Sequence, residues 1–428
     1  MIKPTIILSC PIDCYAGYGA RGRDVAKAII ELDKYDFKIL PQRWGNCSWG
    51  FIDDHKEWDF LKEYILTPQH NTPIPQPEIW IQLTIPNEFV PQGKYNIGMT
   101  AGIESTLCPP EWIEGCNRMD LVIGSSKHTI EVLKECKFQK KDKHTNQVIG
   151  GIELNTKTEV LFEGLNLDTY KQVKSTLDLS DIRESFCYLF VGHWIHGDLG
   201  HDRKNVGLLV KSFCETFKNK QQQPALILKT THGSISYVDR EKILSKIQNI
   251  KKTIKGKLPN IYLLHGEFSD REMNELYNHS KVKAMVSLTK GEGFGRPLLE
   301  FTQTKKPIIT TAWSGHLDFL KPDMSILLPG TLGDVHPSAR NNWFIEGAKW
   351  FDVDTKVFGK VLKDVHKKYK PYLLGSMEQF KYSKINFSFE KMKDKIDSIF
   401  QNNIPNFPKQ IDLKLPKINP PKPEKIKL

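Results

Sequence analysis

The feature that most constrains the fold of this chain is a repeated alternation of short apolar segments with longer amphipathic ones. The apolar segments are rich in β-branched residues, as is typical of buried strands. They occupy residues 5–8, 79–83, 95–99, 121–124, 188–191, 225–228, 261–264, 284–287 and 307–310. Helical patterns between them occupy residues 22–32, 128–136, 205–216 and 271–280. This alternation predicts an α/β fold with parallel sheets that helices cover on both faces.

The strand candidates form two series, which a charged connector around residues 137–151 and a turn at 163–164 separate. A chain of 428 residues also exceeds the usual size of one domain. The organisation that we expect is a first Rossmann-like domain over residues 1–165, a second over 166–385, a closing helix over 386–400 and an extended tail rich in proline and lysine over 401–428.

Charge and cysteine content limit the partners and the compartment. The formal net charge of +11 favours nucleic acid, anionic lipid headgroups or nucleotide phosphates, although general solubility explains it equally well. No apolar run is long enough for a membrane-spanning helix or a signal peptide, so we expect a cytoplasmic protein. The eight cysteines form no CxxC pair, which predicts free thiols. We interpret the Asp-x-Asp at Asp352 and Asp354 as a helix start, so no metal site is expected.

The most informative segment is Lys-Gly-Glu-Gly-Phe-Gly-Arg-Pro-Leu-Leu-Glu at residues 290–300, which follows a predicted strand and begins a helix. Its glycines, which permit a tight turn and a close approach to a ligand, are Gly291, Gly293 and Gly295. The free amides at the helix start would suit a phosphate. Glu292 can then meet the ligand beyond the phosphates, and Glu300, about one turn inside the helix, can accept hydrogen bonds from a ribose diol.

The spacing of Glu292 and Glu300 resembles the signature of the family 4 (group 1) glycosyltransferases, which have the GT-B fold. Further segments that resemble this family follow in its order at residues 16–20, 188–192, 202–206, 307–318 and 387–391. The resemblance implies two doubly wound domains that face each other across a cleft. It implies a retaining glycosyltransferase that moves a hexosyl or pentosyl group from a nucleotide diphosphate sugar to an acceptor hydroxyl.

On the donor side, the resemblance implies that Glu300 binds the nucleotide ribose and that Glu292 contacts the donor sugar near its anomeric carbon. Lys204, with Arg203 beside it, would hold the diphosphate and neutralise the charge of the leaving group. Because these cations would replace a metal, neither a metal nor another cofactor is expected. The other donor-side candidates are Gly293, Phe294, Gly295 and His265, whose loop at 264–267 would read the base.

On the acceptor side, Gly17 and Gly19 resemble the family's glycine loop after the first strand. Glu104 is the candidate for a position where the family often has a histidine near the sugar. The chain also departs from the family at His193, which stands where an arginine is usual. Aromatic residues expected near the acceptor are Tyr15, Tyr18 and Trp112.

The acceptor is suggested by residues 83–89, 95–105 and 117–120, which resemble glycosyltransferases of large tailed phages. Some of those enzymes glycosylate hydroxymethylated DNA bases, which implies a DNA partner and the host cytoplasm, and the positive charge suits DNA. The alternatives are a glycan or lipid-linked acceptor beside a membrane surface, or a non-catalytic protein that binds nucleotide sugars or nucleic acid on the same scaffold. The donor sugar, the base and the oligomeric state do not follow from the sequence.

Overall fold

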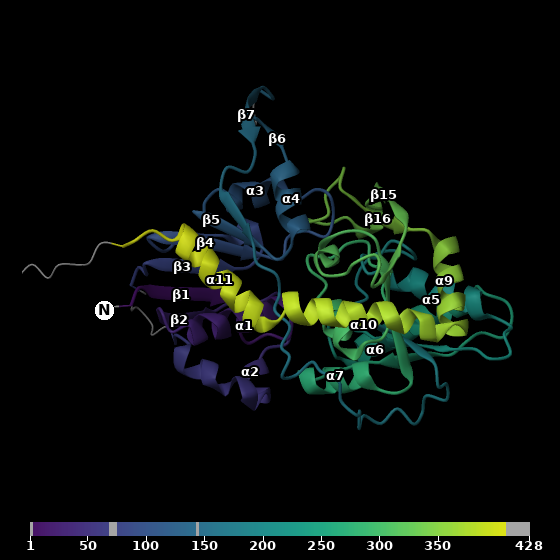
Figure 1. Ribbon diagram of the computed structural model, residues 1–428. Coiled ribbons are helices and arrows are strands. Elements are labelled where there is room, and N and C mark those ends of the chain that lie inside the picture. The colour runs from purple at the N-terminus through teal and green to yellow at the C-terminus, as the bar shows by residue number, and fades with distance from the viewer. Residues whose placement is uncertain (1–2, 68–74, 143–144, 408–428) are drawn as a thin grey trace, which may run out of the picture.

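Two six-stranded sheets, each with all its strands parallel, form the centre of the computed structural model (Figure 1). The structure describes residues 3–67, 75–142 and 145–407. The first sheet has the order β2-β1-β3-β4-β5-β8 and the second β11-β10-β9-β12-β13-β14. Numbered within its own domain, the second order is 3-2-1-4-5-6, that of the dinucleotide-binding fold.

All nine predicted strands are present, with ends that differ by a few residues. In the first sheet they are β1 (Thr5–Cys10), β3 (Ile79–Leu83), β4 (Tyr95–Thr100) and β5 (Leu121–Gly124). In the second sheet they are β9 (Cys187–Val191), β10 (Ala225–Lys229), β11 (Ile261–Leu264), β12 (Val282–Val286) and β13 (Ile308–Thr311). The sequence did not predict the edge strands β2 (Asp36–Pro41), β8 (Lys157–Val160) and β14 (Ile326–Leu328).

Helices cover both faces of both sheets, which confirms the predicted doubly wound α/β class. One face of the first sheet packs against α1 (Gly17–Leu32), the 3-10 helix η1 (Lys56–Tyr64) and α11 (Phe389–Asn403). The other face packs against α3 (Pro110–Cys116) and α4 (Lys127–Glu135). The second sheet lies between α5 (Val206–Phe217), α6 (Tyr237–Lys252) and α9 (Thr355–Lys367) on one face and α7 (Asp270–Asn278) and α8 (Arg296–Phe301) on the other.

The expected connector at residues 137–151 contains a hairpin, formed by β6 (Phe138–Lys141) and β7 (Val148–Ile152), and β8 follows it as the last strand of the first sheet. A second hairpin, β15 (Gly330–Asp334) with β16 (Lys349–Val353), precedes α9. Asp354 accepts the backbone N–H groups of Lys356 and Val357 at the start of α9, which confirms the interpretation of the Asp-x-Asp as a helix start.

The chain crosses from one domain to the other twice, and the two crossing segments lie side by side. Leu165 donates its N–H to the carbonyl of Phe387 at 2.8 Å and accepts the N–H of Phe389 at 2.9 Å. The helices α10 (Tyr369–Asn386) and α11 then run one after the other across the molecule, and α11 returns to the first sheet (Figure 1). The predicted closing helix is therefore present and extends to Asn403, whereas most of the predicted tail lies outside the described residues.

All eight cysteines are free thiols, as predicted. Within residues 3–67, 75–142 and 145–407, no helix is both long and apolar enough to cross a bilayer.

Candidate functional site

A cavity of about 360 Å³ lies between the two domains, where the carboxyl ends of both sheets meet. Its lining residues come from the loops that follow the parallel strands. Gly17 follows β1 and Leu83 ends β3, and these two strands flank the point where the order of the first sheet reverses. His193 follows β9 and Glu292 follows β12, at the corresponding point of the second sheet. Ligands of open α/β sheets bind at such switch points, so both sheets direct a ligand to this cavity.

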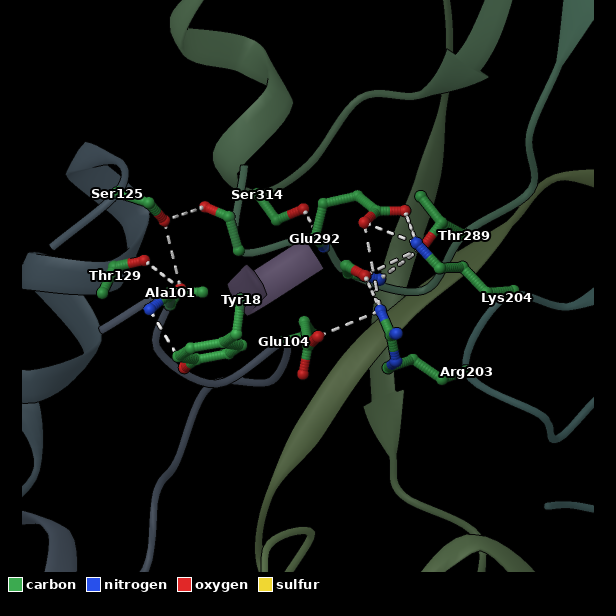
Figure 2. A network of polar contacts seen from close by, with 12 residues as sticks. Tyr18, Ala101, Glu104, Ser125, Thr129, Arg203, Lys204, Thr289, Glu292 and Ser314 are labelled. Carbon is green, nitrogen blue, oxygen red and sulfur yellow. Dashed lines mark hydrogen bonds and ion pairs between the residues drawn. The ribbon is translucent and has the colours of Figure 1, made fainter. Parts of the chain in front are cut away.

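A cluster of two cations and two carboxylates lies inside the cavity (Figure 2). Lys204 Nζ lies 2.5 and 2.6 Å from the two carboxylate oxygens of Glu292. Arg203 Nη1 lies 3.1 Å from Glu104 Oε1 and 3.9 Å from Glu292 Oε2. Because Glu104 belongs to the first domain and Arg203 to the second, the cluster also connects the domains.

The cations determine the charge state of Glu292. Burial raises the pKa of the Glu292 carboxyl, but the charges of Lys204 and Arg203 outweigh it and hold the pKa below its ordinary value. Glu292 is therefore a carboxylate at neutral pH and has no proton to donate. What it offers a ligand is a fixed negative charge beside two fixed positive charges.

His193, which stands where the resembling family has an arginine, does not replace the positive charge. Its Nδ1 lies 2.9 Å from Thr231 Oγ1, and the side chain lines the cavity. Burial, together with the charges of Lys204, Arg203 and Lys229, lowers the pKa of His193 to about 4. The imidazole is therefore neutral at physiological pH and acts as a hydrogen-bonding group.

Two glycines of the 290–300 segment lie against the first domain. A Cβ atom on Gly291 would lie 2.1 Å from the Glu104 carbonyl oxygen, and one on Gly293 would lie 2.4 Å from the Ala101 carbonyl oxygen. The two glycines therefore allow close approach of the other domain, and their predicted role of allowing close approach of a ligand stays a prediction. Gly295 does have a left-handed φ of 95° and caps α8. That helix has only six residues, so the side-chain cations carry most of the positive charge of the site.

We predict that Gly293→Ala lowers the free energy of unfolding by about 1–3 kcal/mol, because the methyl group overlaps the Ala101 carbonyl and the interdomain contact must shift. Denaturant unfolding measures the effect. The matched control is Gly150→Ala on the exposed strand β7, where an added Cβ meets nothing within 4 Å. Equal stabilities of the two variants would contradict the close interdomain contact.

Glu300 lies behind the cavity rather than in its lining. Its carboxylate accepts a hydrogen bond from the Tyr277 hydroxyl at 3.0 Å and pairs with Arg296 Nε at 3.1 Å. Arg296 also pairs with Asp24 of α1 at 2.5 Å and lies 3.7 Å from Glu163. Burial raises the pKa of Glu300 to about 7, although Arg296 opposes the shift. Glu300, which the sequence predicted to bind the ribose, is therefore part of a buried ion network between the domains. Its role toward ribose stays a prediction.

Three other residues expected at the site, Gly19, His265 and Trp112, do not line the cavity. Gly19 packs on Cys14, whose carbonyl oxygen would lie 2.2 Å from an added Cβ, so it serves local packing. His265 Nε2 lies 2.8 Å from Asp239 Oδ2, while its neighbours Gly266 and Glu267 do line the cavity. Trp112 belongs to α3 and is 2% exposed in the core, so the expectation that it stacks on an acceptor was wrong.

The remaining predicted site residues are brought together in the cavity lining: Gly17, Glu104, Arg203, Lys204, Glu292, Gly293, Phe294 and Gly295. Residues that the sequence had not placed in the site, and that the structure adds, are Arg21, Ser125, Glu163, Lys229 and Arg296. Ser125 and Lys229 lie at the ends of predicted strands, so the rule that ligands bind at strand ends could have found these two, whereas Glu163 follows β8, which was not predicted. Tyr18 was expected near the acceptor, and it lines the cavity while stacked on Trp44 with ring centroids 4.1 Å apart.

No protein-family model and no curated protein matches the chain. Among solved structures, a glycosyltransferase from Rickettsia africae is similar with a TM-score of 0.60 at 14% identity, covering 95% of this chain and 100% of that one. Alr3699/HepE of Anabaena in complex with UDP-glucose has a TM-score of 0.58 at 12% identity, covering 93% and 100%. Sucrose-phosphate synthase from Thermosynechococcus elongatus has a TM-score of 0.60 at 11% identity, covering 94% and 98%. These similarities establish the GT-B fold, with two Rossmann-like domains that face each other.

Proposed function

We propose that this protein is a glycosyltransferase that moves a sugar from a nucleotide diphosphate sugar to an acceptor hydroxyl. The observation that carries the proposal is the Lys204–Glu292 pair at the switch point of the second sheet, inside the interdomain cavity. Alr3699/HepE, which is similar in fold, is solved with UDP-glucose, and we propose a donor of that class here. The resemblance of residues 290–300 to the family 4 signature adds support, because that segment contains Glu292.

In the proposed reaction, the bond between the anomeric carbon and the diphosphate breaks as the acceptor oxygen bonds to that carbon. Lys204 and Arg203 stabilise the negative charge that develops on the departing diphosphate. Glu292 faces the positive charge that develops at the anomeric carbon. Glu104 lies in the cavity on the first domain, so it is positioned to receive the proton of the acceptor hydroxyl.

Two finer features of the reaction are also proposed. Retention of the anomeric configuration is supported by the resemblance of the signature segment, and the anomeric coupling in the NMR spectrum of the product tests it. Independence of a metal is supported by the two cations already present beside Glu292. Transfer at an unchanged rate in a chelator tests this second feature, and a loss restored by a divalent cation would refute it.

A panel of nucleoside diphosphates and nucleotide sugars tests the donor. A ligand at about one hundred times its dissociation constant stabilises the native state by about 2.7 kcal/mol, which thermal unfolding detects readily. Release of free nucleotide from the stabilising donor then separates an enzyme from a binding protein. Stabilisation without nucleotide release, even with acceptors supplied, would favour the non-catalytic alternative.

For the acceptor we propose a hydroxymethylated base in DNA. The net charge of +11 supports a polyanionic acceptor, and Tyr18 at the cavity offers an aromatic face on which an extruded base can stack. The host cytoplasm is the proposed compartment, in keeping with eight free thiols. The alternative is a glycan or lipid-linked acceptor.

The acceptor experiment incubates the protein with duplex DNA containing hydroxymethylated pyrimidines and a mixture of nucleotide sugars. Digestion to nucleosides and mass spectrometry would detect the added sugar, and salt-sensitive DNA binding would accompany it. No mass gain with any donor, together with no DNA binding, would refute the DNA acceptor and leave the glycosyltransferase proposal standing.

A further inference from the structure

We propose, on the basis of the function proposed above, that Ser314 is a positioning residue that fixes the main chain of Glu292 and so directs its carboxylate. Ser314 lies in the loop between β13 and the 3-10 helix η4 (Gly315–Asp318). It was not among the predicted site residues, and it does not itself line the cavity.

The backbone of Ser314 is in a conformation that side chains disfavour. Its φ is 81° and its ψ is −162°, in a region that is essentially restricted to glycine. Five other non-glycine residues of the described chain have a positive φ, but their values of 51–59° match the ordinary left-handed helical region. The surrounding structure must therefore hold Ser314 in a conformation that it would not adopt alone.

The contacts of Ser314 and its neighbour explain what this conformation achieves. Ser314 Oγ accepts the backbone N–H of Glu292 at 2.9 Å (Figure 2). The N–H of Gly315 donates to the carbonyl oxygen of Glu292 at 3.0 Å. Both main-chain polar groups of Glu292 are thus held by two consecutive residues, while its side chain pairs with Lys204.

A glycine at position 314 would remove the strain and also the hydroxyl. Ser314 is only 7% exposed, so without the hydroxyl the buried N–H of Glu292 would have no partner in this geometry. The hydroxyl is therefore the feature that distinguishes serine from the less strained glycine here. We infer that it keeps the Glu292 main chain in register with Lys204 and Arg203.

Two variants separate the strain from the hydroxyl. Ser314→Gly loses the hydroxyl and the strain, whereas Ser314→Ala loses the hydroxyl and keeps the strain. We expect Ser314→Ala to have the lower Tm of the two. We expect both to have a kcat for transfer, or for donor hydrolysis, at least tenfold below the wild type. The Kd of the nucleoside diphosphate should stay within about twofold, because the diphosphate is held by other residues.

The matched control is Ser325→Ala, which removes another buried serine hydroxyl of the second domain, one bonded to Gln379. Its kcat should equal that of the wild type even if its Tm falls. A Ser314→Gly variant whose kcat is within twofold of the wild type would overturn this inference alone. A wild-type protein that neither transfers nor hydrolyses any donor would overturn the proposed function, and this inference with it.

Discussion

Glu292→Gln is expected to lower the rate of sugar transfer by about 100- to 1000-fold, the range measured when a preorganised charge-stabilising group is removed from an active site. The neutral amide cannot face a developing positive charge as the carboxylate does. It also leaves Lys204 without its charged partner. Because the side chain of Lys204 is only 13% exposed, water cannot replace that partner well. We therefore expect stability to fall as well, by about 3 kcal/mol, since a buried charge loses its compensation.

A double variant separates these two effects. Adding Lys204→Met to Glu292→Gln removes the uncompensated charge, so we expect the unfolding free energy to recover while transfer stays impaired. Unfolding of both single variants and the double variant forms a double-mutant cycle. Lys381→Met, which breaks a pair with Glu378 whose two side chains are each 56% exposed, is the control and should change stability by less than about 1 kcal/mol. A Glu292→Gln protein with undiminished transfer would refute the assigned role.

Arg296→Met is expected to destabilise the protein by about 3–5 kcal/mol at pH 8, because it leaves several buried carboxylates without their shared cation. Arg296 contacts Asp24 and Glu163 of the first domain as well as Glu300 in its own helix. The variant therefore removes an interdomain connection as well as a local ion pair. Arg340→Met, which breaks a pair with the exposed Glu346, is the matched control.

The destabilisation by Arg296→Met should depend on pH. Burial raises the pKa of Glu300 from 4.5 to about 7, so between these values the native state holds a proton that the unfolded state releases. The unfolding free energy then falls as pH rises, by up to about 1.4 kcal/mol per pH unit for this one group. Loss of Arg296 raises the pKa further and extends the fall to higher pH. Unfolding at pH 5.5 and pH 8 should therefore show the larger loss at pH 8, and an equal loss would contradict this account.

The core strands could be predicted from the local sequence pattern, because each central strand is buried on both faces of its sheet. Eight of the nine predicted strands are central and the ninth, β11, is a half-buried edge strand, but all nine are largely apolar runs, which can be recognised without tertiary information. The edge strand β8, Lys-Thr-Glu-Val, mixes charged and apolar residues because solvent reaches it, so its sequence resembles a loop. The same holds for the half-exposed β2, while β14 has only three residues.

The residues of the candidate site could be predicted from the sequence to the same extent. Parallel strands bring the loops after their carboxyl ends to one edge, so Arg203, Lys204 and Glu292 could be grouped from their positions along the chain. The hydrogen-bond partners of these residues could not be predicted. Glu300 has the spacing of a cavity residue, but Tyr277 and Arg296 hold its carboxylate behind the cavity.

Local sequence was thus sufficient for the nine predicted strands, for several of the helices, for the parallel arrangement of the sheets and for the strand ends at which a ligand site forms. These properties depend on hydrophobic periodicity and backbone preferences within about twenty residues. Only the tertiary structure decided that Gly291 and Gly293 face the other domain, that Arg296 reaches Asp24, and that Ser314 adopts a strained φ beside Glu292. The first two depend on how the two domains pack against each other, and the third depends on the contact between two loops. No local pattern encodes which partner a side chain or a backbone group meets in such contacts.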